Sequence, residues 1–132
     1  METYLLVAGS RDYTDKETFN KVMDCFIQEN IPGGDVYICQ GGATGADRMA
    51  LEYACRHEWE CLEFEADWEK YGRAAGPKRN DKMTKYVKDH GGMALFFWDG
   101  KSKGTKNCIE SARKHGLPVR IWNTAEGRYM DE

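Results

Sequence analysis

The feature that most constrains the fold is a regular alternation of short apolar runs with longer helical patterns. Apolar runs rich in β-branched and aromatic residues predict strands at residues 3–8, 35–39, 61–66, 93–98 and 118–122. Between them, apolar residues recur with helical spacing at residues 15–30, 46–57, about 77–90 and 105–116. Strands that alternate with helices form a mostly parallel sheet with helices on both faces. The sequence therefore predicts an α/β, Rossmann-like, doubly wound domain with a mostly parallel five-stranded sheet.

The length of 132 residues suits one domain with a single sizeable core. Neither an internal repeat nor an interdomain linker interrupts the alternation. We therefore assign residues 1–122 to one domain and residues 123–132 to a polar C-terminal tail, which we expect to be loose.

The charge balance limits the classes of partner. Nineteen basic and 22 acidic residues give a formal net charge of −3, whereas duplex nucleic acid requires a concentrated cationic face. A small anionic ligand needs only a local site and is compatible with this balance. No signal peptide and no apolar run of membrane-spanning length are visible, so we expect a cytoplasmic protein that does not contact a membrane.

The cysteines do not form a recognisable metal or disulfide pattern. Five is an odd number, and no CxxC spacing occurs, so we expect buried free thiols at Cys25, Cys39, Cys55, Cys61 and Cys108. We also expect no metal and no cofactor. Asp99 has a side chain that could ligate a metal, but no partner carboxylate stands at a suitable spacing.

The predicted topology indicates where a ligand would bind. Doubly wound sheets bind ligands beyond the carboxyl ends of their strands, where the strand order reverses, which for the order 3-2-1-4-5 lies between the first and fourth strands. Small and polar residues follow four of the predicted strands, at residues 8–15, 40–47, 75–80 and 99–105. We expect these four loops to converge on one rim.

In the first loop, Gly9 permits a tight turn, Ser10 offers a hydroxyl and Arg11 has a guanidinium suited to phosphate or carboxylate. A simple turn with a solvated arginine is the alternative. The GxGxxG fingerprint of dinucleotide-binding domains is absent here.

The second loop, "GGATGAD", precedes a predicted helix. Backbone N–H groups at such a helix start attract anions, and the candidates are Gly41, Gly42, Thr44 and Gly45. Asp47, in the first helical turn, either complements the helix dipole or accepts hydrogen bonds from ribose hydroxyls.

The third loop combines aromatic and cationic residues. Pro77 suits the first turn of a helix and places Arg79 and Asn80 near its start, where they could hold a sugar phosphate. Trp68 and Tyr71 precede them and either stack on a base or cover the loop.

The fourth loop contains Gly100-Lys101-Ser102, which is similar to the end of a P-loop. The glycine that a P-loop requires five residues earlier is Leu95, so the motif fails. The remaining candidates are Ser102, Gly104 and Thr105, at a helix start suited to phosphate.

Together the four loops resemble a known family. The segments "GSRDYTD", "GGATGAD", "AGPKRN" and "GKSKGT" are similar to the YspA/YpsA-related branch of the SLOG superfamily, in order, over residues 4–122. That superfamily includes the DprA (Smf) proteins and the Lonely Guy phosphoribohydrolases. The resemblance implies a Rossmann-like domain that binds a nucleotide or nucleotide-derived ligand with its glycine loops.

The resemblance also implies where catalytic residues would lie. Lonely Guy enzymes cleave the N-glycosidic bond of a nucleoside monophosphate with an arginine and the glutamate of a "PGGxGTxxE" motif. Arg79 falls where that arginine would be, but Cys108 occupies the position of the glutamate, and Glu110 lies about 200° further around the helix. Asp99-Gly100-Lys101 replaces "PGG". Asp47 is the remaining carboxylate that could face a ligand.

Three functions are compatible with these residues. The first is binding or sensing of a nucleotide-derived molecule, and the second is hydrolysis of a nucleotide N-glycosidic bond with Asp47 and Arg79. The third, a DprA-like module for single-stranded DNA, requires a cationic groove with stacking aromatics and fits an acidic chain least well. A homodimer or higher homo-oligomer is compatible with aromatic residues near the sheet edge, such as Trp98 and Trp122.

Overall fold

The computed structural model describes residues 2–130. Six strands form one sheet in the order β3-β2-β1-β4-β5-β6. They are β1 (Glu2–Gly9), β2 (Asp35–Gln40), β3 (Glu60–Glu63), β4 (Met93–Trp98), β5 (Val119–Asn123) and β6 (Arg128–Tyr129). All neighbouring strands are parallel except β5 and β6. The predicted α/β class, parallel sheet and order of the first five strands are confirmed.

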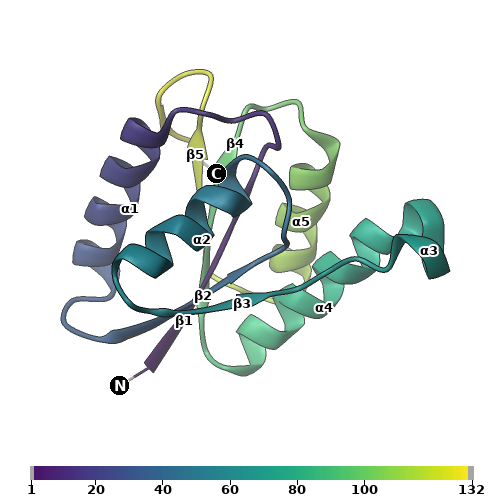
Figure 1. Cartoon of the computed structure of the whole chain (residues 1–132), viewed down its shortest axis with the longest axis horizontal. Coiled ribbons are helices and arrows are strands. Elements are labelled where there is room, and N and C mark those ends of the chain that lie inside the picture. The colour runs from purple at the N-terminus through teal and green to yellow at the C-terminus, as the bar shows by residue number, and fades with distance from the viewer. Residues whose placement is uncertain (1, 131–132) are drawn as a thin grey trace.

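Helices cover both faces of the sheet, as Figure 1 shows. The helical elements are α1 (Lys16–Asn30), α2 (Ala46–Arg56), α3 (Trp68–Tyr71), the 3₁₀ turn η1 (Gly72–Ala74), α4 (Ala75–Asp89) and α5 (Lys103–Lys114). Side chains alternate along β1, so Leu5 and Val7 face α1 and α2, whereas Leu6 and Ala8 face α4 and α5. Two buried clusters therefore pack against the central strand from opposite sides.

The C-terminal residues are more ordered than the sequence predicts. The expected loose tail contains β6, which pairs with β5 through Trp122 and Tyr129, so the sheet has six strands and not five. Asn123 forms the turn between them, because its Oδ1 accepts hydrogen bonds from the amides of Ala125 (2.9 Å) and Glu126 (2.8 Å). The ring of Tyr129 packs edge-on against half-buried Trp122. Residues 131–132 of the predicted tail lie outside the described residues.

The expectation of five buried thiols is wrong for Cys25 and Cys55, which are exposed. Both lie on helices whose 3.6-residue period directs neighbouring positions inward, Phe26 in α1 and Ala54 in α2. Cys39 and Cys108 are buried, and Cys61 is intermediate.

None of the helices within residues 2–130 is both long enough and apolar enough to cross a bilayer. The short α3 projects from the body at the N-terminal end of α4 (Figure 1), and its Trp68 and Tyr71 are exposed by 51% and 40%.

Candidate functional site

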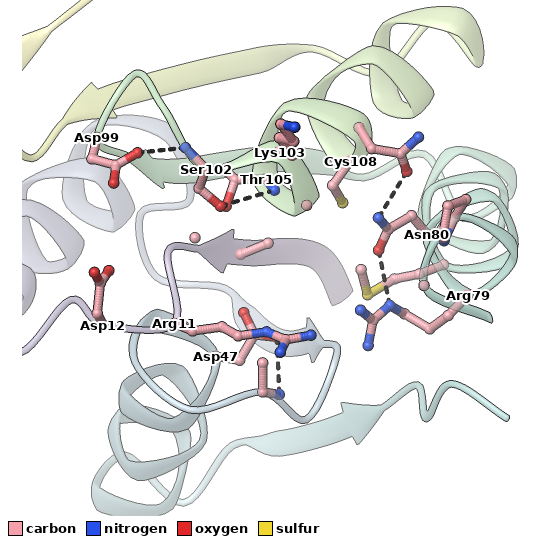
Figure 2. Close-up of a pocket in the computed structure, with 18 of the residues that line it drawn as sticks. Arg11, Asp12, Asp47, Arg79, Asn80, Asp99, Ser102, Lys103, Thr105 and Cys108 are labelled. Atoms are coloured by element: carbon pink, nitrogen blue, oxygen red, sulfur yellow. Dashed lines mark hydrogen bonds between the residues drawn. The ribbon is translucent and has the colours of Figure 1, made fainter. Parts of the chain in front are cut away.

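A cavity of about 700 Å³ opens at the carboxyl ends of β1 and β4, where the predicted topology places a ligand. We call it the first cavity. Figure 2 shows Ser102, Lys103 and Thr105 of the α5 start along one wall, and Arg11 and Asp47 along the other. Arg79 and Asn80, from the first turns of α4, lie at one end of it. Residues from four loops therefore meet on one rim, as the sequence predicts.

The loop before α2 is folded around the carboxylate of Asp47. Its Oδ2 accepts hydrogen bonds from the amides of Gly41 and Ala43, each at 3.2 Å. Among residues 2–130, its Oδ1 has no hydrogen-bond partner although the side chain is buried. Burial raises the pKa of Asp47 to about 6, against the lowering effects of the Ala43 amide, the Arg79 charge and the amides of Gly41 and Gly9. A buried carboxylate oxygen without a partner costs free energy that a bound donor would recover.

Arg79 connects α4 to the same loop. Its Nη1 donates to the carbonyl oxygens of Gly41 and, at 3.4 Å, Phe64. Its Nε donates to Asn80 Oδ1 at 2.8 Å, and Asn80 Nδ2 donates in turn to Asn107 Oδ1 at 2.9 Å. The guanidinium is therefore fixed by α4, α5 and the loop before α2, next to the Asp47 carboxylate.

The start of α5 is capped by side chains of the loop before it. Ser102 caps the helix, since its Oγ accepts from the Thr105 amide at 3.4 Å. Asp99 Oδ1 accepts from the amides of Lys101 and Ser102, both at 2.8 Å. Burial alone would raise the pKa of Asp99, but these amides lower it below its usual value. A Cβ placed on Gly104 would meet no atom within 4 Å, so the first turn of α5 is open to the cavity.

The first cavity is cationic although the chain is acidic. Its lining includes three carboxyl side chains and five cationic ones, Arg11, Arg73, Arg79, Lys101 and Lys103. One of the carboxyl groups is Asp47, whose raised pKa leaves it partly protonated near pH 6. The charge of this site favours an anionic ligand.

A second cavity of about 650 Å³ lies on the other side of the 41–44 loop. The two cavities share Arg11, Ala43, Trp68 and Arg79. The residues that line the second cavity alone are Gly41, Gly42, Thr44, Glu63, Glu65 and Ala66. Its unshared charges are thus both negative.

Most of the predicted site residues line one of these cavities. Those in the first are Gly9, Arg11, Asp47, Trp68, Arg79, Asn80, Ser102, Gly104 and Thr105. Gly41, Gly42 and Thr44 line the second. Whether these residues bind a ligand stays a prediction.

Ser10 and Gly45 line neither cavity and hold the two glycine loops together. The buried Ser10 donates its amide to the Phe97 carbonyl at 3.1 Å, and its own carbonyl accepts from Ala46 at 3.4 Å. Gly45 lies so close to Ser10 that a Cβ there would be 2.2 Å from the Ser10 oxygen. Thr44 also contributes, since its hydroxyl donates to the Arg11 carbonyl at 3.0 Å.

Sequence reasoning missed several lining residues, among them Asp12, Arg73, Lys103 and Asn107. Asn107 lies one helical turn after Lys103, so its position on the cavity side of α5 could have been found from helical spacing. Arg73 comes from η1, whose position depends on the path of the chain after β3, and no local pattern predicts it.

Cys108 lines the first cavity, whereas the three histidines lie outside both cavities. Burial and the neighbouring Asp47 charge raise the pKa of Cys108 to about 12, so its thiol stays protonated at neutral pH. The three histidines each follow a helix as its C-terminal cap and line neither cavity. Within residues 2–130, no three His, Cys, Asp or Glu side chains are grouped so as to hold a metal ion.

Comparisons with known proteins agree with the loop motifs. The family described as the YspA, cpYpsA-related SLOG family matches residues 3–71. Gene 61 protein of Mycobacterium phage D29 is 36% identical over 122 residues, which cover 87% of this chain and 92% of that protein. The SPbeta prophage-derived protein YoqJ of Bacillus subtilis strain 168 is 30% identical over 63 residues, 48% of this chain and 36% of that protein.

No solved structure matches the chain significantly. The family match covers more than half of the chain and includes the first two glycine loops, and the phage relative extends the similarity to most of the remaining chain. The chain therefore belongs to the YspA, cpYpsA-related SLOG family.

Proposed function

We propose that the chain binds a nucleotide or nucleotide-derived small molecule in the first cavity and acts as a binding or sensing domain. Membership of the SLOG family suggests a nucleotide-related binding or phosphoribohydrolase-like role. The observation that carries the proposal is the buried Oδ1 of Asp47, which has no hydrogen-bond partner among residues 2–130, on a residue that lines a cavity with more cationic than carboxyl side chains. An anionic ligand that also carries hydroxyl donors would satisfy both features.

The two walls of the cavity suit two parts of such a ligand. Lys101 and Lys103 stand beside the open first turn of α5, where backbone amides and the helix dipole favour a phosphate. Asp47, on the opposite wall, can accept a hydrogen bond from a ribose hydroxyl through Oδ1. Arg79 stabilises the Asp47 loop from one end of the cavity.

Replacing both Lys101 and Lys103 with alanine is expected to weaken binding of nucleoside monophosphates by about tenfold, because two charge-assisted contacts to phosphate are lost. Isothermal titration calorimetry with AMP, GMP, CMP and UMP measures the change. Both lysines are exposed, so the melting temperature of the free protein should stay nearly the same.

Lys106→Ala is the matched control, since Lys106 is an exposed lysine of α5 that lines neither cavity. It should leave affinity unchanged. Equal affinity of the double variant and the wild type for every nucleotide would contradict the proposal that the phosphate binds at the start of α5. The nucleosides, which lack the phosphate, should bind wild type and double variant alike.

Hydrolysis of an N-glycosidic bond is the second candidate, and it rests on the pKa of about 6 for Asp47. A carboxyl group that titrates near neutral pH can exchange a proton with a reacting group, and a carboxylate can stabilise an oxocarbenium-like transition state. Cys108, with its protonated thiol, replaces the glutamate of the Lonely Guy motif and supplies no second carboxylate.

Chromatography of nucleoside monophosphates and NAD after incubation with the protein distinguishes the two candidates. Release of free base by the wild type, abolished by Asp47→Asn, would establish hydrolysis and contradict a pure binding role. Ligand-dependent thermal stabilisation without any product supports binding alone.

A further inference from the structure

The second cavity differs from the first in its charge balance, and the two share Arg11, Ala43, Trp68 and Arg79. The charged residues that line only the second cavity are Glu63 and Glu65, whereas the first holds Lys101 and Lys103. Counted with the shared Arg11 and Arg79, the first cavity has two more cationic than carboxyl side chains, whereas the second has equal numbers, so a phosphate is favoured in the first. A ligand that fills both is therefore expected to carry its phosphate in the first cavity and an uncharged, donor-rich group in the second.

Glu63 is held in place by a buried side chain. Gln40, only 1% exposed, donates from Nε2 to Glu63 Oε1 at 3.0 Å and accepts the Gly42 amide through its Oε1 at 2.5 Å. A Cβ on Gly42 would come within 3.1 Å of Glu63 Oε2, so glycine leaves room for this carboxylate against the loop. Glu63 Oε2 accepts no hydrogen bond among residues 2–130, which leaves it available to a ligand donor.

Glu65, two residues further along the chain, lines the same cavity and is exposed. Ionised carboxylates only accept hydrogen bonds, so this pair selects for donors. The indole of Trp68, half exposed and shared by both cavities, offers an aromatic surface beside them. Carboxylates next to an exposed ring suit a flat group that stacks and presents N–H donors at its edge.

Among the nucleobases, guanine presents such an edge. Its N1–H and its exocyclic amino group at C2 are adjacent donors that one or two carboxylates can accept. Adenine places an acceptor, N1, beside its amino group, and hypoxanthine lacks the C2 amino group. A carboxylate facing the adenine N1 lone pair would be repelled, so the pair of glutamates discriminates between the purines.

We infer that the site binds a guanine nucleotide across both cavities, with the base against Glu63, Glu65 and Trp68 and the phosphate at the start of α5. This inference rests on the proposed function, since it specifies the ligand class of the same site. The ribose then lies near the 41–44 loop. There the unpartnered Oδ1 of Asp47, a residue that is only 5% exposed, can accept a hydrogen bond from a ribose hydroxyl.

Calorimetric titration of the full chain with GMP, IMP and AMP tests the inference. GMP is expected to bind about tenfold more tightly than IMP or AMP, because IMP loses one donor to the carboxylates and AMP presents an acceptor to them. The double variant Glu63→Gln and Glu65→Gln should lose about tenfold in affinity for GMP and bind AMP at least as tightly as the wild type, because the charge that repels adenine N1 is removed.

Glu60→Gln is the matched control, because Glu60 is an exposed glutamate of β3 that lines neither cavity. It should keep the wild-type preference for GMP. Glutamine at position 63 retains an oxygen for Gln40 Nε2, and the melting temperature of the double variant verifies that the fold is intact.

The outcomes separate the inference from the proposed function. Equal affinity of the wild type for GMP, IMP and AMP, or an equal loss for all three in the double variant, would overturn the guanine assignment and leave nucleotide binding standing. A wild type that binds none of the three would overturn both. Trp68→Ala should weaken the binding of all three nucleotides to a similar extent. Unchanged affinities would contradict the placement of the base in the second cavity.

Discussion

Replacing Gly45 with alanine is expected to lower the free energy of unfolding by roughly 3–5 kcal/mol, from a steric clash and a strained backbone together. Gly45 has φ of +76° and ψ of −128°, a backbone conformation that residues other than glycine rarely adopt. A Cβ there would lie 2.2 Å from the Ser10 carbonyl oxygen and 2.6 Å from that of Arg11. Both atoms are backbone, so they cannot move aside without separating the two loops that border the cavity.

Urea denaturation followed by circular dichroism measures this loss. Gly33→Ala is the matched control, because Gly33 also has a positive φ, +68°, but nothing lies within 4 Å of an added Cβ. It should cost only about 1 kcal/mol, the price of the backbone conformation alone. Equal losses at the two positions would show that contact between the loops contributes nothing to stability.

The fold could be predicted from the sequence to the extent that local patterns determine it. The β4 bounds match the predicted strand, residues 93–98, because a continuous apolar run is typical of a buried central strand. The strand β6 could not be predicted, since its two residues are set by the Asn123 turn and by packing of Tyr129 against Trp122. Such contacts carry no periodic signal in the sequence.

For the site, loop positions could be predicted but side-chain roles could not. The glycines of "GGATGAD" indicated a loop at the rim, yet Gly45 serves contact with Ser10, and Gly42 makes room for Glu63. The sequence left two roles for Asp47, and its hydrogen bonds to the amides of Gly41 and Ala43 became visible only in three dimensions. The second cavity was missed altogether, because β3 and the loop before α2 meet only in the folded sheet.

The raised pKa of Asp47 makes its ionisation a cost to the folded state. Below pH 3.8, its ordinary value, the carboxyl is protonated in both the folded and unfolded chains, and its contribution to stability does not change with pH. Between pH 3.8 and about 6, the folded chain binds the proton and the unfolded chain does not, so stability falls as pH rises. Above pH 6 the full cost, about 3 kcal/mol for a shift of some two pKa units, is present.

Asp47→Asn is therefore expected to raise the free energy of unfolding at pH 8 by about 1–2 kcal/mol, less than the full 3 kcal/mol because its new amide nitrogen replaces the unpartnered Oδ1 and finds no acceptor. Below about pH 4, where the wild-type carboxyl is neutral, only the unpaired amide remains, and the variant should be less stable than the wild type by about 1–2 kcal/mol. Urea titrations of the two proteins from pH 4 to 8 measure the difference. Asp99→Asn should behave in the opposite way near neutral pH, since the pKa of Asp99 is lowered and its carboxylate stabilises the fold.

Asp47→Asn should also weaken nucleotide binding by about tenfold or more. A carboxylate oxygen that accepts a hydrogen bond from a ribose hydroxyl is replaced by an amide nitrogen, which cannot accept one. Greater stability together with lost affinity is the signature of a charge kept buried for a ligand. If Asp47 only complemented the positive end of the α2 dipole, its neutralisation would lower stability at pH 8 and leave GMP binding intact. Calorimetry with GMP and denaturation of the same protein samples decide between these two roles. The two roles predict changes of opposite sign in the free energy of unfolding, and only one of them predicts a loss of affinity for GMP.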